Sequence, residues 1–151
     1  SLFSSMINRS IKLLEGIDET HEEFEVKIGE NGFIPETFIP QTEVRLEIYK
    51  KFSSVKNTEN LNQLIKEIED RFGALPEDIK ILVNLTCIRI ESSKLLITKI
   101  KGDNKKCTLS LSDNSNLVSK NSSVREISIN YPEKIYSKSE FLLNKLKSFS
   151  N

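Results

Sequence analysis

The stretch IEDRFGALPED, residues 68–78, predicts the end of one helix, a tight turn and the start of a second helix. Gly73 is placed to end the first helix, because glycine adopts the left-handed conformation of the C′ position at no steric cost. Pro76 suits the first turn of the next helix, and Glu77 and Asp78 stabilise its positively polarised end. The stretch also carries charged residues that no apolar core requires, which raises the question of what they contact.

Three helices are predicted around this turn, because apolar residues recur with helical spacing on both sides of it. They cover residues 42–55, 59–72 and 76–94, and Thr58 is the expected N-cap of the second. The second helix carries a single apolar stripe, made of Leu61, Leu64, Ile65, Ile68 and Phe72. The third is apolar on two sides, which indicates a central position among the helices.

Alternating apolar and polar residues predict strands farther from the turn. They are EFEVKI at 23–28, a hairpin of 95–101 and 106–112, and a strand at 125–131. The side chains expected to face inward are Phe24, Val26, Ile28, Cys107, Leu109, Leu111, Ile127, Ile129 and Tyr131. A group of helices with a small, mostly antiparallel sheet indicates an α+β fold.

Further segments complete the predicted path of the chain. Residues 2–14 have the spacing of an amphipathic helix, and the acidic stretch at 15–23 reads as a linker. The two prolines of FIPETFIP, residues 33–40, predict an extended crossing pinned to the core by its phenylalanines and isoleucines. Ser137 and Glu140 are spaced as a capping box, which predicts a C-terminal helix.

The composition of the chain argues against several classes of function. The chain has 22 lysines and arginines and 22 aspartates and glutamates, so its net charge is zero at neutral pH. Nucleic-acid-binding modules usually carry a positive excess that displaces condensed counterions, so this balance argues against DNA as the main partner. Cys87 and Cys107 lack the spacing of a zinc ribbon or a disulfide scaffold, and we expect buried free thiols. No apolar run is long enough for a membrane span, and we expect a cytoplasmic location.

The sequence contains no constellation typical of a catalytic or cofactor site. The five glycines stand singly, without the spacing of a phosphate-binding loop. The one histidine, His21, lies in the acidic linker with Asp18, Glu19, Glu22 and Glu23. A linker does not hold metal ligands or a catalytic base in fixed positions. We therefore expect no cofactor, no metal and no enzymatic activity from this stretch.

Three charged residues lie together on one flank of the helix predicted at 59–72. Glu67, Asp70 and Arg71 are three and four positions apart, so their side chains are surface neighbours away from the apolar stripe. A Glu67–Arg71 ion pair has the favourable orientation and would support the helix by about 0.3–0.5 kcal/mol. Two interpretations stay open: simple helix support, or an interface for another protein module.

The same region resembles a known family. IEDRFGALPED is similar to the helix–Gly–x–x–Pro–helix signature of the C-terminal domain of the bacterial transcription-repair coupling factor. EVKIGENGFIPETFIP resembles that family's strand and crossing, and RLEIYKKFSSVKNTENLNQLIKEIEDRFG resembles its next two helices. SLFSSMINRSIKLLEG resembles the end of the preceding translocase module. The resemblance implies a tail helix of that module at 1–16, a linker at 17–22 and a regulatory domain at 23–151.

The resemblance also implies a function. Members of this family are ATP-driven double-stranded DNA translocases that bind stalled RNA polymerase and recruit the damage-recognition protein of excision repair. Their C-terminal domain is non-catalytic, and it packs on an N-terminal repair module similar to a helicase subunit, which hides the recruiting surface and restrains the motor.

The residues that match the family's contact are Glu67, Asp70 and Arg71, and we expect a monomeric fragment. The alternative is a nucleic-acid-binding accessory domain of a DNA translocase.

Overall fold

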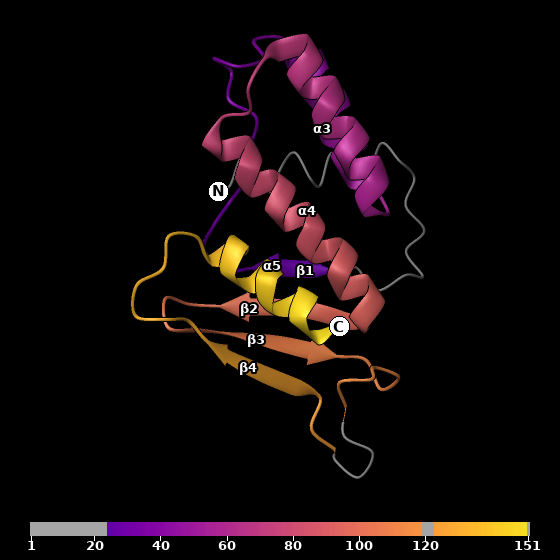
Figure 1. The fold of residues 1–151 in the computed structure, drawn as a ribbon, viewed down its shortest axis with the longest axis vertical. Coiled ribbons are helices and arrows are strands. Elements are labelled where there is room, and N and C mark those ends of the chain that lie inside the picture. The colour runs from indigo at the N-terminus through magenta and orange to yellow at the C-terminus, as the bar shows by residue number, and fades with distance from the viewer. Residues whose placement is uncertain (1–23, 119–122, 151) are drawn as a thin grey trace. The chain divides into compact units, whose positions relative to one another are not determined.

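The computed structural model describes residues 24–118 and 123–150 of the chain. In chain order the elements are β1 (Glu25–Lys27), α2 (Thr42–Ser54), α3 (Thr58–Phe72), α4 (Glu77–Leu95), β2 (Ile97–Gly102), β3 (Lys106–Leu111), β4 (Glu126–Asn130) and α5 (Lys138–Phe149) (Figure 1). The expected α+β fold is confirmed. The helix expected at 2–14 and the linker expected at 15–23 lie outside the described residues.

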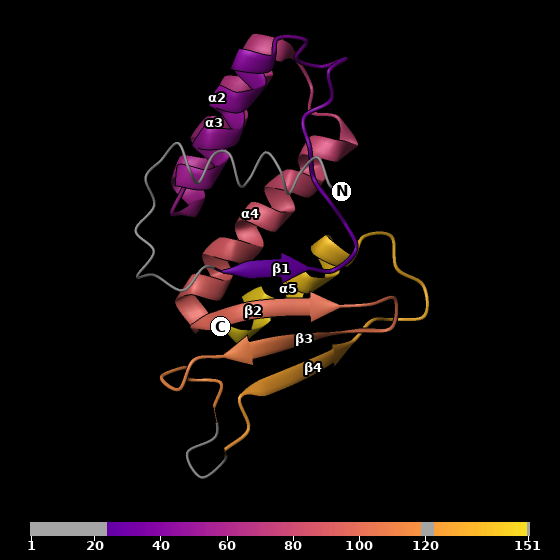
Figure 2. The same cartoon turned by 180° about the vertical axis from the view of Figure 1, so that it is seen from behind.

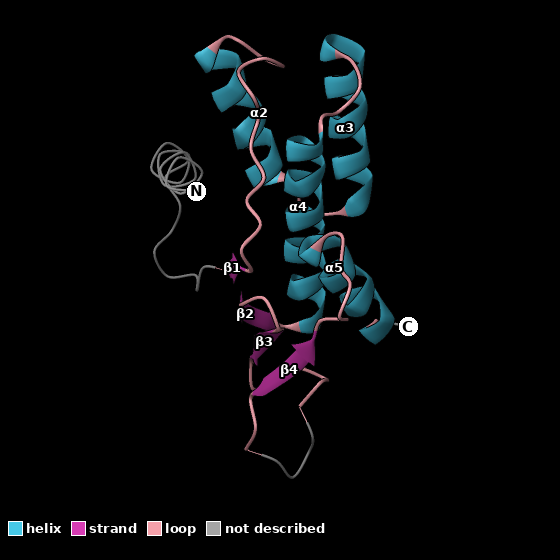
Figure 3. Cartoon of the chain, turned by 90° about the vertical axis from the view of Figure 1, so that its left-hand side faces the viewer, coloured by secondary structure: helices cyan, strands magenta, loops and turns pink. Residues whose placement is uncertain are grey.

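The described residues divide into two compact units. The helical unit comprises residues 31–86, and the sheet unit comprises the described residues of 24–30 and 87–150. The boundary falls within α4, after Thr86. The strands, drawn in magenta in Figure 3, all belong to the sheet unit, whereas α2 and α3 belong to the helical unit.

The helices of the helical unit lie where their periodicity predicts, but the first cap differs. Asn57, not Thr58, is the N-cap of α3, and its side-chain oxygen accepts a 2.8 Å hydrogen bond from the Asn60 amide. Asn57 has extended backbone angles, whereas Thr58 is already helical, and a cap residue needs the former. The prediction of Thr58 as the cap is therefore wrong by one position.

Gly73 ends α3 as predicted, although its conformation is not the left-handed one. Its φ of 101° is positive, but its ψ of −168° is extended, a combination that essentially only glycine adopts. The Gly73 amide still donates a 2.9 Å hydrogen bond to the carbonyl of Glu69. The residue thus closes the last turn of α3 while the chain leaves in an extended direction.

The segment at 33–40 is extended only in part, because it contains a turn at residues 36–38. The amides of Phe38 and Ile39 both donate 3.0 Å hydrogen bonds to the carbonyl of Pro35. The buried Arg45 of α2 then holds the end of the segment, since its guanidinium donates 2.8 Å hydrogen bonds to the carbonyls of Ile39 and Pro40.

Two further contacts fix the start of this segment. The Ile34 amide donates a 2.7 Å hydrogen bond to the hydroxyl of Tyr49, which lies on α2. Gly32 lies directly against α4, where a Cβ atom would come within 2.3 Å of the Leu82 nitrogen. The Arg45 and Tyr49 side chains therefore serve the fold, because they satisfy buried backbone groups that the prolines leave without regular partners.

The sheet unit contains one four-stranded sheet with the strand order β1-β2-β3-β4. β1 runs parallel to β2, and the other neighbouring pairs are antiparallel, as the prediction of a mostly antiparallel sheet requires. α5 covers one face of the sheet. The sheet lies behind α5 in Figure 1 and in front of it in Figure 2.

The inward positions of the hairpin are confirmed. Cys107, Leu109 and Leu111 alternate with polar residues and are buried, as are Ile129 and Tyr131, whereas Ile127 is partly exposed. Both cysteines are free thiols, with Cys107 buried and Cys87 half-buried. Burial raises the pKa of both thiols, so neither is poised as a nucleophile.

The start of α5 combines a local cap with a distant one. Ser137 is the predicted N-cap, and its hydroxyl accepts a 3.2 Å hydrogen bond from the Glu140 amide. The carboxylate of Glu30, in the segment after β1, accepts further hydrogen bonds from the Ser137 hydroxyl and from the amides of Lys138 and Ser139. An acidic group here is stabilised by the positive end of the helix dipole.

Within residues 24–118 and 123–150, none of the helices combines the length and the apolarity that a bilayer crossing demands.

Candidate functional site

The second half of α3 places Glu67, Asp70 and Arg71 on the surface of the helical unit. The side chains of Glu67 and Arg71 are 37% and 40% exposed, and Asp70 is exposed. The opposite side of the helix is apolar, and there Leu61, Leu64 and Ile68 are buried. The predicted separation of a charged flank from an apolar stripe is therefore confirmed.

The expected ion pair between Glu67 and Arg71 is wrong. Both oxygens of the Glu67 carboxylate instead accept hydrogen bonds from the Lys51 ammonium of α2, at 2.8 and 3.0 Å. The Lys51 nitrogen also lies 3.4 Å from Glu47, whose carboxylate lies 3.8 Å from the Arg71 guanidinium. Tertiary packing brings α2 beside α3, and a closer cation from α2 replaces the partner on the same helix.

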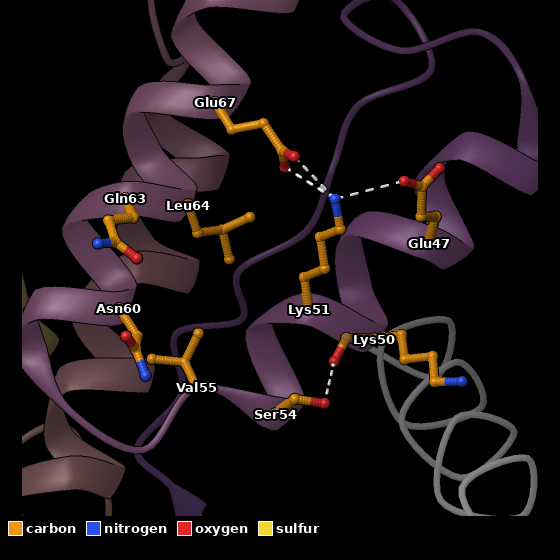
Figure 4. A pocket seen from close by; sticks show the side chains of 9 residues that line it. All are labelled: Glu47, Lys50, Lys51, Ser54, Val55, Asn60, Gln63, Leu64 and Glu67. Atoms are coloured by element: carbon orange, nitrogen blue, oxygen red, sulfur yellow. Dashed lines mark hydrogen bonds and ion pairs between the residues drawn. The ribbon is translucent and has the colours of Figure 1, made fainter.

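These four residues form one chain of alternating charge, Glu67–Lys51–Glu47–Arg71, which we call the charge chain. Figure 4 shows Lys51 between the carboxylates of Glu67 and Glu47. The hydrogen bond to Glu67 is the main cause that raises the pKa of Lys51, and the attraction of Glu47 raises it further. The lysine therefore stays protonated at neutral pH and keeps the two helices electrostatically joined.

Arg71 ends the charge chain and is held from a second side. Its guanidinium carbon lies 4.8 Å from the centre of the Phe72 ring, a cation–π geometry. The Phe72 ring in turn lies 6.0 Å from the ring of Phe38. The Arg71 side chain is thus positioned by an aromatic pair, while its half-exposed guanidinium has donors left for a partner.

Asp70 has no such engagement. It accepts no hydrogen bond and forms no ion pair with any residue in the part of the chain that the structure describes. Its carboxylate is one residue from Arg71 and three from Glu67, so a lone anion stands at the edge of an otherwise paired group. This arrangement can bind a cationic side chain without first breaking an existing ion pair.

A hollow of about 480 Å³ lies next to the charge chain, between α2 and α3 (Figure 4). Its lining residues are Glu47, Lys50, Lys51, Ser54, Val55, Asn60, Gln63, Leu64 and Glu67. No cysteine or histidine lines it, and the described residues include no cluster of histidine, cysteine or carboxylates able to hold a metal ion.

The sequence indicated part of this group. Glu47 and Lys51 are four positions apart on one predicted helix, a spacing that favours an ion pair. Their approach to Glu67 and Arg71 depends on how α2 packs against α3, which no local pattern reports.

Comparisons with known proteins support the resemblance noted in the sequence. The family model described as the TRCF domain matches residues 28–122, which include Glu67, Asp70, Arg71 and the rest of the charge chain. A solved crystal structure of the C-terminal domain of transcription-repair coupling factor is similar to this chain with a TM-score of 0.67. It is 19% identical and the match covers 85% of this chain and 97% of that chain, so it supports the fold alone.

Curated proteins named transcription-repair-coupling factor are also similar. The protein of Borreliella burgdorferi is 33% identical over 104 residues, and that of Escherichia coli is 30% identical over 111 residues. The matches cover 68% and 70% of this chain but only 9% and 10% of those proteins. The chain therefore spans about a tenth of the length of the curated relatives that it matches.

Proposed function

Because this chain belongs to the TRCF domain family, we propose that it is the non-catalytic C-terminal regulatory domain of a transcription-repair coupling factor. The full protein would be an ATP-dependent translocase on double-stranded DNA that contacts stalled RNA polymerase. This domain would dock on an N-terminal repair module of the same protein. While docked, it hides the surface that recruits the excision-repair damage-recognition protein and restrains the translocase.

The docking face in this proposal is the flank of α3 with Glu67, Asp70 and Arg71. The observation that supports the assignment is the exposed Asp70 carboxylate, which pairs with none of the described residues and lies beside an Arg71 guanidinium that Phe72 holds in place. A contact that must open again is better made by polar groups than by a large apolar surface, which would not release. Exposed charges of both signs supply register and partner choice more than affinity.

The three residues have unequal roles in this proposal. Glu67 is already bonded to Lys51, so a partner would have to compete with that ion pair for its carboxylate. Asp70 meets a partner's cation with nothing to displace, and Arg71 can donate a forked pair of hydrogen bonds to a partner's carboxylate. We therefore expect Asp70 and Arg71 to matter most for docking, and Glu67 least.

The test measures binding of this chain to the separately produced N-terminal repair module, at low and at physiological salt. Asp70→Ala with Arg71→Ala should weaken binding by tenfold or more, which corresponds to the loss of about 1.4 kcal/mol. Glu59→Ala with Lys66→Ala is the matched control, since it also removes one anion and one cation from the exposed side of α3. The control should change binding less than twofold.

Two results would contradict this proposal. One is unchanged binding of the Asp70/Arg71 variant at low salt, and the other is an equal loss in the control variant. Thermal unfolding of both variants checks the fold, and both should stay within about 1 kcal/mol of the wild type because the sites are exposed.

A further inference from the structure

The zero net charge of the chain conceals a separation of charge between the two units. Among the described residues, the helical unit has 7 lysines and arginines against 9 aspartates and glutamates. The sheet unit has 12 lysines and arginines against 8 aspartates and glutamates, a net charge of +4. The balanced charge of the whole chain therefore does not exclude an anionic partner for the sheet unit.

Part of this excess lies on the face of the sheet opposite α5. Lys27 is paired in register with Lys101, and Lys99 is paired with Glu25, so these side chains share one face. The residues that alternate with them, such as Ile100 on β2 and Cys107 on β3, are fully buried. Within the sheet unit, no described helix lies over this second face, which is turned to the viewer in Figure 2.

Lys106 extends the same face onto β3, because it lies next to the inward Cys107 and is exposed. We call Lys27, Lys99, Lys101 and Lys106 the lysine face. The side chain of Lys27 is 70% exposed and that of Lys99 is 40% exposed. The lysine face is therefore open to a partner as it stands.

The nearby acidic groups neutralise part of this charge. Glu126 of β4 shares the lysine face, because it pairs in register with Ser110, the register partner of Lys99. Glu25 lies 2.9 Å from the Lys27 ammonium and 3.8 Å from that of Lys99. Asp103 points its carboxylate at the hairpin turn, where it accepts hydrogen bonds from the amides of Lys105 and Lys106. The nearness of the Lys99 ammonium lowers the pKa of Lys101, which is a sign of uncompensated positive charge.

Neutral hydrogen-bond donors continue the rows that the lysines begin. Thr108 is the register partner of Lys101 on β3, and Ser128 is the partner of Thr108 on β4. Their hydroxyls lie 3.5 Å apart and are exposed. Ammonium and hydroxyl groups in neighbouring rows are the donors that proteins use for phosphate oxygens.

The composition of this face selects among anionic partners. The strand residues on it include no arginine, so its cations are the compact point charges of lysine, which bind phosphate without forked hydrogen bonds. They also include no aromatic side chain, on which the bases of a single strand would stack. Point charges and hydroxyls on a flat surface suit the sugar–phosphate backbone of a duplex.

We propose that the lysine face of the sheet unit binds the phosphate backbone of duplex nucleic acid without reading its sequence. Four lysines less two glutamates, Glu25 and Glu126, leave about two phosphates neutralised, so log K should fall with log salt at a slope of about −2. This site lies on a different unit from the docking face on α3 and does not depend on it.

The test uses this chain and a fluorescently labelled DNA duplex of about 20 base pairs, with anisotropy measured over a salt titration. Lys27→Gln with Lys101→Gln should reduce the salt slope by about 2 and weaken binding at least tenfold at low salt. Lys145→Gln with Lys147→Gln is the matched control, because it removes two exposed lysines from α5 in the same unit. The control should leave both the slope and the affinity within twofold of wild type.

Three outcomes would overturn the proposal: no duplex binding at low salt, an equal loss in the two variants, or unlabelled polyglutamate that competes as well as unlabelled duplex. The last outcome would instead assign the face to an acidic protein segment. All the variants keep Glu67, Asp70 and Arg71, so failure here would leave the docking test on α3 unaffected.

Discussion

The N-termini of α3 and α5 differ in their capping, and the difference shows that the two units are stabilised internally in different ways. Each helix starts with a polar side chain that accepts a hydrogen bond from the amide three residues later, Asn57 in α3 and Ser137 in α5. Of the two, α5 has a second cap among the described residues, because the Glu30 carboxylate reaches its first amides from more than 100 positions away. Folding of α5 is therefore coupled to the segment that follows β1, whereas α3 is capped by its own flank.

The units also differ in how their charges are used. In the helical unit the ions of α2 and α3 form the charge chain, which runs from Glu67 to Arg71, and Asp70 lies beside it. In the sheet unit four lysines share one face with two glutamates, Glu25 and Glu126. The first arrangement suits a partner with charges of both signs, and the second suits a polyanion.

The largest expected effect comes from Gly32 of the helical unit, and Gly102 of the sheet unit gives the comparison. Gly32→Ala would place its Cβ atom 2.3 Å from the backbone nitrogen of Leu82, and neither backbone can yield without moving α4. We expect a loss of about 3 kcal/mol or more in the free energy of unfolding. Gly102→Ala would meet the Cys107 Cβ, the Lys106 carbonyl oxygen and the Tyr131 hydroxyl at 2.9–3.0 Å, and should cost less, about 2 kcal/mol, because these approaches are longer.

Urea unfolding measures both glycine variants, and amide hydrogen exchange locates the damage. Gly32→Ala should lower protection first at the helical unit, near α2 and the start of α4. Equal destabilisation by the two substitutions would mean that the units tolerate added volume alike, which would remove this part of the comparison.

A smaller effect is expected from the two caps. Glu30→Ala removes a carboxylate that several α5 donors share, and should cost about 2 kcal/mol. Asn57→Ala removes one local hydrogen bond and should cost about 1 kcal/mol. Chemical denaturation gives the two values, and Glu30→Gln, which keeps an acceptor but not the charge, should fall between wild type and Glu30→Ala. A larger loss from Asn57→Ala would show that the distant cap adds little.

The smallest effects are expected from single ion pairs. Glu67→Gln breaks the exposed pair with Lys51 and should cost about 0.5 kcal/mol. Glu25→Gln should be slightly destabilising at neutral pH, because it leaves the neighbouring lysines unopposed. The hydrogen bond from Lys27 lowers the pKa of Glu25 below its ordinary value of 4.5. The stabilisation that the Glu25 carboxylate contributes is therefore fully present above about pH 4.5, and it is lost as the pH falls through the lowered pKa of Glu25.

Urea midpoints of wild type and Glu25→Gln measured at neutral pH and at about pH 3 check this sign. The difference between the two proteins should shrink on acidification. A difference that grows at low pH would show that Glu25 is not stabilised as a carboxylate.

Local patterns predicted most of the elements. The helical period at Leu61, Leu64 and Ile68 and the alternation at Cys107 and Leu109 were enough, because each pattern needs only neighbours along the chain to decide which side is buried. The cap at Ser137 was predictable for the same reason. The cap at Thr58 was predicted one residue late, since Asn57 and Thr58 are both good caps and only backbone conformation distinguishes them.

The candidate site was predictable in its residues but not in its bonds. The position of Glu67, Asp70 and Arg71 on an exposed flank follows from helical geometry alone. The partners do not, because Lys51 and Glu47 reach α3 only after α2 packs beside it. The lysine face could not be predicted from the net charge, because the net charge does not depend on where the fold places each residue.

The amino-acid sequence by itself determined where helices and strands form, which side of each is apolar, and the family resemblance carried by the turn at Gly73 and Pro76. Those properties depend on neighbours within a few positions. The tertiary structure alone decided the pairing of Glu67 with Lys51, the reach of Glu30 to α5, and the gathering of four lysines on one sheet face. Each of these joins segments distant in the chain, and the free energy that brings them together comes from burying apolar residues elsewhere in the same unit.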